Sequence, residues 1–111
     1  MTTAFEVKAR RDEYKQVFLE AWRGTTQIGF AEGYPGLDGD LFLKYFEIFG
    51  RYRRKGYGRT MAARLEGFAR SWGYGSITLK PNDLRSAQFW TAMGYTLNPD
   101  DPFRQWQKDL R

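Results

Sequence analysis

The amino-acid sequence predicts a single α+β domain over residues 1–111, with a mixed, mostly antiparallel sheet and two main helices in the order β-β-β-β-α-β-α-β-β. Two observations predict this class. In the first half of the chain apolar and polar residues alternate, as in strands, whereas after Arg51 apolar residues recur every three or four positions, as on a helix. The length of 111 residues allows one hydrophobic core and leaves no room for a second.

Four strands are predicted in the first half. In the second of them Val17 and Leu19 face one side and Phe18 faces the other, which is the two-residue period of a strand. A tight turn at residues 24–25 leads into the third strand and is typical of a hairpin. Residues 34–39 form a loop by composition, and the most apolar run of the chain follows as a central strand. The predicted strands are residues 3–10, Tyr14–Arg23, Thr26–Tyr34 and Asp40–Phe49.

Two amphipathic helices and three short strands are predicted in the second half. The first helix carries an apolar stripe and ends at Gly73. The second follows a break at residues 81–83, with Asp83 or Ser86 as its cap and Gly94 at its end. The stripe consists of Tyr57, Met61, Leu65, Phe68 and Trp72, and the predicted strands are Ser76–Lys80, Tyr95–Leu97 and Phe103–Leu110.

The composition excludes several kinds of chemistry. The chain has no Cys and no His, which excludes disulfides, thiolate nucleophiles, zinc fingers and His-based catalysis, and no metal site is expected. No apolar run reaches the roughly 18–20 residues that cross a bilayer. Residues 1–5 lack the basic and apolar pattern of a signal peptide. These features predict a cytoplasmic protein that does not enter membranes.

The charge balance predicts an anionic partner. Lys and Arg number 18 against 13 Asp and Glu, which gives a net charge of +5. The charge is concentrated in residues 51–59 (RYRRKGYGR), between an apolar strand and the first helix. Gly56 and Gly58 allow tight or left-handed backbone conformations and the close approach of a ligand. The free amides and the positive dipole end of a helix N-terminus suit a pyrophosphate group.

The spacing of this loop differs from the nucleotide-binding patterns G-x-x-x-x-G-K-[ST] and G-x-G-x-x-G. Arg53, Gly56 and Gly58 instead form R-x-x-G-x-G, which resembles the acyl-CoA pyrophosphate loop of the GNAT superfamily of N-acetyltransferases. Ile48 and Tyr52 lead into Arg53 as the Val-x-Pro-x-Tyr of that family leads into its Arg.

A second stretch also resembles the GNAT family. Residues 82–95 (NDLRSAQFWTAMGY) are similar to its closing signature, in which an Asn precedes a helix that ends in fY-x-x-x-GF. Phe89-Trp90 takes the "fY" place and Gly94-Tyr95 the "GF" place. The resemblance extends roughly from Trp22 to Leu110 and implies a small GNAT-like fold.

The resemblance implies acetyl-CoA as the co-substrate. The backbone amides of residues 54–59 would hold the CoA pyrophosphate, with Arg53, Arg54 and Lys55 as charge support. The strands at residues 46–49 and 77–80 would splay apart to admit pantetheine and present backbone amides to the thioester as an oxyanion hole. The expected CoA-binding residues are Ile48, Phe49, Arg53, Arg54, Lys55, Gly56, Tyr57, Gly58, Arg59, Asn82, Phe89 and Trp90.

The catalytic positions depart from the family pattern. The usual general acid of the family is a Tyr where this chain has Trp90, and an indole cannot deliver a proton at neutral pH. Trp90 is therefore expected to pack against other side chains or to line the pantetheine site. Glu47 is the nearest candidate base, although it points to the wrong face of its strand unless a bulge shifts it. Tyr95, acting through water, is the second candidate. Further candidates are Glu32, Asp40 and Tyr45, and attack by a deprotonated amine needs no strong base.

The acceptor side also departs from the family. Its members carry one or two helices between their first two strands, whereas about three residues separate the strands predicted here. The acceptor side is therefore expected to be open, completed by a second subunit, or shaped for a macromolecule. An edge strand and many aromatic residues are compatible with a homodimer. No stretch of the sequence specifies the acceptor, whether small molecule or protein.

Three functions follow from these features. The first is an acetyl-CoA-dependent N-acetyltransferase, an acyltransferase in which a primary amine attacks the thioester directly. The second is a catalytically weak or inactive acyl-CoA-binding or interaction module, which Trp90 and the missing base would suit. The third is a small basic nucleic-acid-binding protein, in which Tyr52 and Tyr57 stack bases among the loop cations.

Overall fold

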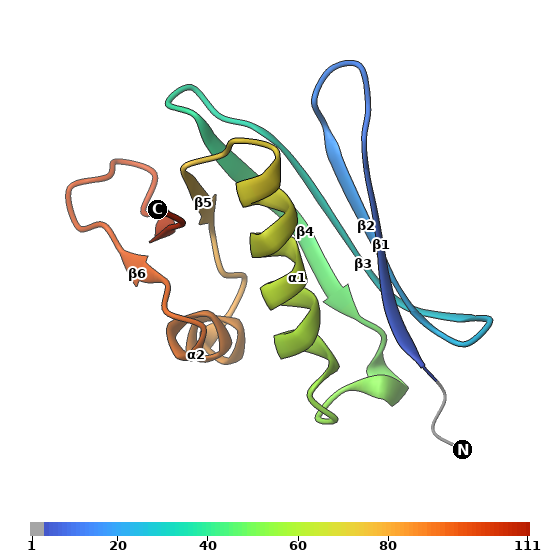
Figure 1. Ribbon diagram of the computed structural model, residues 1–111. Helices are drawn as coiled ribbons and strands as arrows, with labels where there is room; N and C mark the ends of the chain where they lie inside the picture. Colours follow the sequence, from blue (N-terminus) through green and yellow to red (C-terminus); the bar gives the residue numbers. More distant parts are fainter. Residues whose placement is uncertain (1–3) are drawn as a thin grey trace.

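The computed structural model describes residues 4–111, which form a seven-stranded sheet and two α-helices (Figure 1). The predicted element order is confirmed, with one added 3-10 turn before the first α-helix. No helix within residues 4–111 is long and apolar enough to cross a bilayer. The strands are β1 (Phe5–Arg11), β2 (Val17–Arg23), β3 (Thr26–Pro35), β4 (Asp40–Ile48), β5 (Ser76–Leu79), β6 (Thr96–Leu97) and β7 (Trp106–Asp109). The helices are η1 (Gly50–Tyr52), α1 (Tyr57–Ser71) and α2 (Leu84–Ala92).

The sheet is mixed and mostly antiparallel, as predicted. Its strand order is β1-β2-β3-β4-β5-β7-β6. The first four strands form an antiparallel meander, and β5, β7 and β6 also pair antiparallel. β4 and β5 run parallel, with α1 as their crossover connection. A short loop therefore connects the C-terminal end of β4 to the N-terminus of α1.

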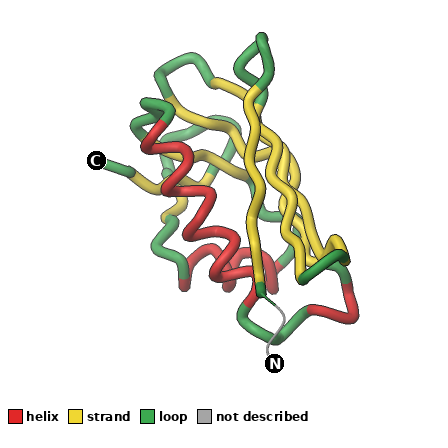
Figure 2. Tube along the Cα trace, turned by 45° about the vertical axis from the view of Figure 1, so that its right-hand side comes forward, coloured by secondary structure: helices red, strands yellow, loops and turns green. Residues whose placement is uncertain are grey.

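Both α-helices lie on one side of the sheet formed by β1 to β4 (Figure 2). Side chains alternate between the two faces along each strand outside the bulges, and those that face the helices are half-buried in β1 and mostly buried in β2, β3 and β4. No helix of residues 4–111 covers the other side of β1–β4, which we call the outer face (Figure 2). The residues that form the buried core include Val17, Leu19, Ile28, Leu41, Met61, Leu65 and Ile77.

The observed strands are shorter than predicted where turns precede them. β2 begins at Val17 and not at Tyr14, because Asp12 accepts hydrogen bonds from the N–H groups of Tyr14 and Gln16 and closes a turn. Residues 103–105 are likewise not part of β7, since Asp101 accepts from the N–H groups of Phe103 and Gln105. The first strand starts at Phe5, and the predicted start at residue 3 lies outside the described residues.

Candidate functional site

β4 extends beyond the end of its parallel neighbour β5. Their parallel pairing joins Asp40–Leu43 to Ser76–Leu79 and stops there, although β4 continues to Ile48. The two strands therefore open a gap on the C-terminal side of Leu43. The expected splay of residues 77–80 from β4 is not seen over residues 77–79, which pair with β4; the gap arises because β4 runs on after β5 has ended.

Backbone groups of β4 face this gap. The N–H of Phe49 donates to the carbonyl of Ile28 in β3 at 2.8 Å. Hydrogen bonding alternates along an antiparallel pair, so Glu47 also bonds toward β3. Phe46 and Ile48 then direct their backbone groups toward the gap. One side of the gap thus presents N–H groups that β5 does not use.

A β-bulge determines the direction of Glu47. The register shifts between Glu32 and Gly33 of β3, where Lys44 is an extra residue in β4. Because of this extra residue, Glu47 points to the outer face, as Phe42 does. Without a bulge the Glu47 side chain would point to the face that does not suit a catalytic base. The structure contains the bulge that this role requires.

Two glycines shape the loop between η1 and α1. Gly56 precedes α1 with a φ of +84°, in the left-handed region that favours glycine. A Cβ at Gly58 would lie 3.4 Å from the ring of Phe89, in van der Waals contact with it. The N–H of Thr60 is the first to bond back within the helix, to the carbonyl of Gly56. The N–H groups of residues 57–59 therefore have no partner within the helix, which is the arrangement that binds anions.

The cations of the loop have two different environments. Arg53 turns back toward β4: its Nε donates to the carbonyl of Ile48 at 2.8 Å, and its guanidinium lies 3.7 Å from the Glu47 carboxylate. Arg54 has a φ of +62°, a strained conformation for a residue with a side chain. Arg53 thus ties the loop to β4, whereas the remaining cations are open to a ligand. Besides Arg53, the exposed cationic side chains of the loop are those of Arg51, Arg54, Lys55 and Arg59.

The start of α2 forms the opposite wall. Asp83 caps this helix by accepting a hydrogen bond from the N–H of Ser86 at 2.7 Å. Trp90 is 4% exposed, and its ring makes edge contacts with the rings of Phe46 and Phe89 at centroid distances of 4.9 Å. This side chain therefore packs in the core and also lines the apolar inner part of the wall.

These elements enclose a groove of about 910 Å³. Phe49 and Tyr57 were expected to bind CoA but turn away from the groove: Phe49 packs near Phe30 on the outer face, and Tyr57 stacks on Phe5 at 5.2 Å. Lys55 does not line it either. The other expected residues do line it, namely Glu47, Ile48, Arg53, Arg54, Gly56, Gly58, Arg59, Asn82, Phe89 and Trp90.

Tyr95 lies outside the groove, which corrects the expectation that it is catalytic. Its side chain is 1% exposed and its hydroxyl donates to Glu66 Oε2 at 3.2 Å. Burial and the neighbouring Glu66 carboxylate raise the pKa of Tyr95 well above its usual range. The Lys108 ammonium donates to Glu66 Oε1 at 2.9 Å and to the Met93 carbonyl at 2.8 Å. Tyr95 therefore belongs to a buried cluster that joins α1 to the C-terminal strands.

The remaining carboxylate and phenol candidates also lie elsewhere. Asp40 accepts a hydrogen bond from the hydroxyl of Thr78 at 2.8 Å, at the paired end of β4 and β5. Glu32 and Tyr45 are cross-strand neighbours on the outer face. Among these carboxylates only Glu47 lines the groove.

Several lining residues were not identified from the sequence. Arg85 and Ser86 line the groove because they belong to the first turn of α2, and their position next to the predicted cap at Asp83 was the available signal. Phe46 was expected to border the pantetheine gap only through its backbone, and its side chain could not be placed because the bulge decides which face it takes. Within residues 4–111 no group of three or more Asp or Glu side chains is arranged to hold a metal ion.

Comparison with known proteins agrees with this geometry. The model of the acetyltransferase (GNAT) family matches residues 2–95. A search of curated proteins finds no sequence match. Solved structures with the same fold include a Bacillus subtilis acetyltransferase in complex with CoA, with a TM-score of 0.80 and 12% identity, covering 97% of this chain and 100% of that one.

Two further structures share the fold. The PaiA N-acetyltransferase of Thermoplasma acidophilum, in complex with coenzyme A, has a TM-score of 0.73 and 21% identity over 85% of this chain and 60% of that one. An aminoglycoside 6'-acetyltransferase type Ii has a TM-score of 0.72 and 18% identity over 89% of this chain and 72% of that one.

Proposed function

Since this chain belongs to the GNAT family of acetyltransferases, we propose that it transfers an acetyl group from acetyl-CoA to a primary amine. The observation that carries the proposal is the groove itself, which joins the N-terminus of α1 to the part of β4 that runs beyond its pairing with β5. CoA has a matching shape and charge, because it carries a pyrophosphate at one end of an extended pantetheine arm. Two of the structures that share this fold are CoA complexes.

The loop is suited to the pyrophosphate. The N–H groups of residues 57–59 and the N-terminal end of the α1 dipole would bind its oxygens, and the exposed guanidinium of Arg54 would neutralise charge. Arg59 and Arg85 also line the groove and would add to this field. Gly58 would leave room beside Phe89 for the chain that follows.

The gap between β4 and β5 is suited to the thioester end. The N–H groups of Phe46 and Ile48 face it and would donate to pantetheine or to the thioester carbonyl. The carbonyl of Ile48 already accepts from Arg53, so Arg53 holds this segment of β4 in place. The rings of Phe46 and Trp90 would exclude water from the inner wall.

Acetyl-CoA supplies an activated acyl carbon, which gains a bond to the amine nitrogen and loses its bond to sulfur. Glu47 lines the groove and lies on the open side of the sheet, where an amine can approach. It would accept the proton that the nitrogen loses. Water would protonate the departing CoA thiolate, since Trp90 has no acidic proton and Tyr95 is buried against Glu66.

Release of CoA thiol in the presence of a panel of primary amines tests the proposal, with mass spectrometry to detect the acetylated amine. We expect turnover with at least one amine and a decrease of about 10²–10⁴-fold in kcat for Glu47→Gln, because a general base contributes that much. Glu13→Gln, at an exposed position on the β1–β2 turn, is the control and should keep full activity.

The same experiment distinguishes the alternatives. Acetyl-CoA binding without turnover of any amine would favour a CoA-binding module of the same fold. Full activity of Glu47→Gln would mean that the amine attacks without a protein base. Salt-dependent binding of an oligonucleotide, with no thermal stabilisation by acetyl-CoA, would favour the nucleic-acid-binding alternative.

A further inference from the structure

The side chain of Arg53 contacts the end of β4, although its backbone belongs to the loop before α1. The 3-10 turn η1 reverses the chain between the two. Within it the N–H of Tyr52 donates to the carbonyl of Phe49 at 2.8 Å, and the N–H of Arg53 donates to that of Gly50 at 3.3 Å. This turn brings Arg53 back beside Ile48, which lies five residues earlier in the chain.

Two nitrogens of the Arg53 guanidinium contact two different groups of β4. Nε donates to the carbonyl of Ile48 at 2.8 Å, and Nη2 lies 3.7 Å from Oε1 of Glu47. The backbone of Ile48 is directed toward the gap, whereas the side chain of Glu47 points to the outer face. The guanidinium therefore spans the edge of β4. A planar fork of N–H donors can make both contacts at once, which a single ammonium group cannot do in the same geometry.

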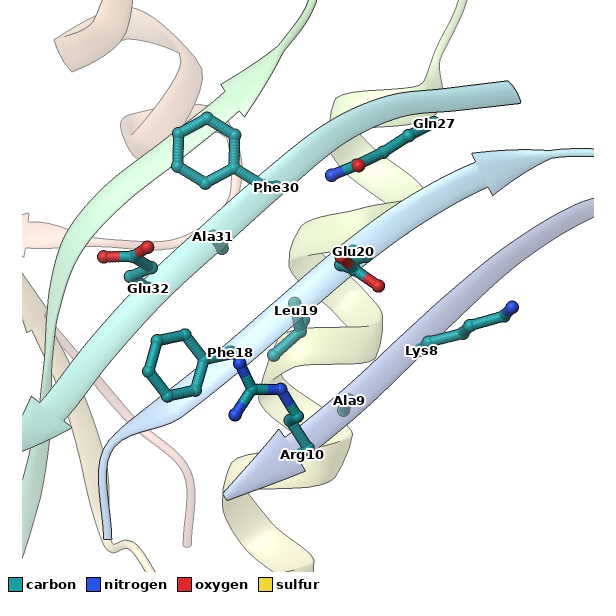
Figure 3. Close-up of a pocket in the computed structure, with 10 residues that line it drawn as sticks. All are labelled: Lys8, Ala9, Arg10, Phe18, Leu19, Glu20, Gln27, Phe30, Ala31 and Glu32. Atoms are coloured by element: carbon teal, nitrogen blue, oxygen red, sulfur yellow. The ribbon is translucent and has the colours of Figure 1, made fainter. Parts of the chain in front are cut away.

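The Glu47 carboxylate has few other restraints. Within residues 4–111 its only ion pair is the one with Arg53. Its cross-strand partner on β3 is Phe30, whose ring has no hydrogen-bond donor. Figure 3 shows that Phe30 and Glu32 stand on the same face of β3, so the next side chain along this strand carries a like charge. A glutamate that is 46% exposed would sample several rotamers without Arg53.

We propose that Arg53 is a positioning residue, which holds the Glu47 carboxylate beside the thioester and does not bind the CoA pyrophosphate. This inference rests on the proposed acetyl transfer. The bond to the Ile48 carbonyl anchors the guanidinium to the strand segment whose N–H groups would bind the thioester, so the base and the thioester share one support. At 3.7 Å the carboxylate is ion-paired and not hydrogen-bonded, which leaves its oxygens free to accept the proton of the amine.

Other groups of the groove can balance the charge of the pyrophosphate. Arg54, Arg59 and Arg85 line it, and none of them forms an ion pair in the part of the chain that the structure describes. The N–H groups of residues 57–59 are also available at the start of α1. Loss of the Arg53 side chain leaves this anion site in place. We therefore expect its loss to lower turnover and to spare the affinity for acetyl-CoA.

Turnover and affinity of the full chain test the proposal, with the most active amine of the panel as acceptor. Arg53→Ala should lower kcat at saturating substrates by at least about tenfold, since a 1 Å displacement of a catalytic group can cost about 100-fold. Its Kd for acetyl-CoA, measured by calorimetry, should stay within about threefold of the wild-type value. Arg53→Lys keeps the charge without the fork and should be similarly slow. Arg64→Ala, at an exposed position of α1, is the control and should keep the wild-type kcat and Kd.

A double-variant cycle shows whether Arg53 acts through Glu47. In that case Arg53→Ala should lower the kcat of the wild type and leave the kcat of Glu47→Gln unchanged, because the two losses are one and the same. Circular dichroism reports whether each variant folds, and Arg53→Lys takes the place of Arg53→Ala in the cycle if the alanine variant does not.

The outcomes separate this inference from the proposed function. With an active wild type, additive losses in the cycle, about tenfold weaker acetyl-CoA binding by Arg53→Ala, or full kcat of either Arg53 variant or of Glu47→Gln would each overturn the role of Arg53 and leave acetyl transfer in place. A wild type that turns over no amine would overturn both.

Discussion

In the cluster of Glu66, Tyr95 and Lys108 each polar head group has a partner, whereas Arg54 and Arg59 of the loop over residues 51–59 line the groove without an ion-pair partner among residues 4–111. The carboxylate of Glu66 receives one hydrogen bond from each of the other two side chains, and Lys108 also donates to a backbone carbonyl. In the loop, Arg53 alone is paired, and Arg54 occupies a strained left-handed conformation.

This contrast separates charges that stabilise the fold from charges available to a ligand. A buried carboxylate destabilises a protein unless its partners satisfy it, so the Glu66 cluster contributes to the folded state alone. Exposed cations contribute little to stability, and a strained backbone opposes it. The loop is therefore expected to affect ligand binding, and the buried cluster is expected to affect unfolding. Substitutions in the two regions can test this separation.

The largest effect is expected for Glu66→Ala. Loss of this carboxylate leaves Lys108 and Tyr95 without their shared partner, and we expect the free energy of unfolding to fall by about 3 kcal/mol. Urea unfolding measures the change. The affinity for acetyl-CoA should be unchanged in the folded fraction. Asp109→Ala, at an exposed position of β7, is the control. An equal decrease in its free energy of unfolding would contradict a particular contribution of the Glu66 cluster to stability.

Arg54→Gly should weaken acetyl-CoA binding and leave the free energy of unfolding unchanged, the opposite of Glu66→Ala. It removes an exposed cation from the loop and should weaken acetyl-CoA binding by about 1–3 kcal/mol, the usual range for a charge-assisted hydrogen bond. Stability without ligand should not fall, since glycine adopts the φ of +62° without strain. Calorimetric titration and urea unfolding measure the two quantities. A loss of stability with unchanged acetyl-CoA affinity would mean that Arg54 stabilises the fold and does not bind the ligand.

The two glycines of α1 provide a matched pair. Gly58→Ala adds a methyl group beside Phe89 and should reduce acetyl-CoA affinity by about tenfold, within the range for an overfilled site. Gly67→Ala adds the same group where nothing lies within 4 Å, and should leave binding unchanged. Alanine favours the helix at both positions, so neither variant should lose stability; Gly67→Ala should gain about 0.5–1 kcal/mol. Equal acetyl-CoA affinities of the two variants would mean that acetyl-CoA does not bind beside Gly58.

The smallest effect concerns alkaline pH. The pKa of Tyr95 is raised by burial and by Glu66, so this phenol stays protonated in the folded chain when its unfolded counterpart ionises above pH 10. The unfolded state then binds fewer protons, and stability falls as pH rises past this value, by at most about 1.4 kcal/mol per pH unit. Tyr95→Phe should flatten this decline, whereas Tyr14→Phe, at an exposed position, should not.

Parts of the fold and site that depend on local pattern were predictable from the sequence. The change of apolar period after Arg51 gave the element order, and Gly56 and Gly58 located the loop because only a few backbone conformations bring amides to a phosphate. The role of Tyr95 was not predictable, because its partner Glu66 lies 29 residues away and only the packed fold brings them together.

The bulge in β4 also could not be predicted from the sequence. Lys44 is the extra residue, and β4 has no glycine or proline to mark it; the glycine at the shift, Gly33, lies on the partner strand β3. Since a shift of one residue exchanges the two faces of a strand, Glu47 could be placed only with the register known. The bond from Arg53 to the Ile48 carbonyl was missed for a related reason, because the motif assigned this side chain to the ligand.

The most direct test of the account is to titrate the ¹⁵N-labelled protein with acetyl-CoA and follow its backbone amide resonances. The account predicts that the largest shifts occur at residues 54–59 and 46–48, on the two sides of the groove, with little change on the outer face of β1–β3. Shifts concentrated on the outer face, or none at millimolar acetyl-CoA, would contradict it.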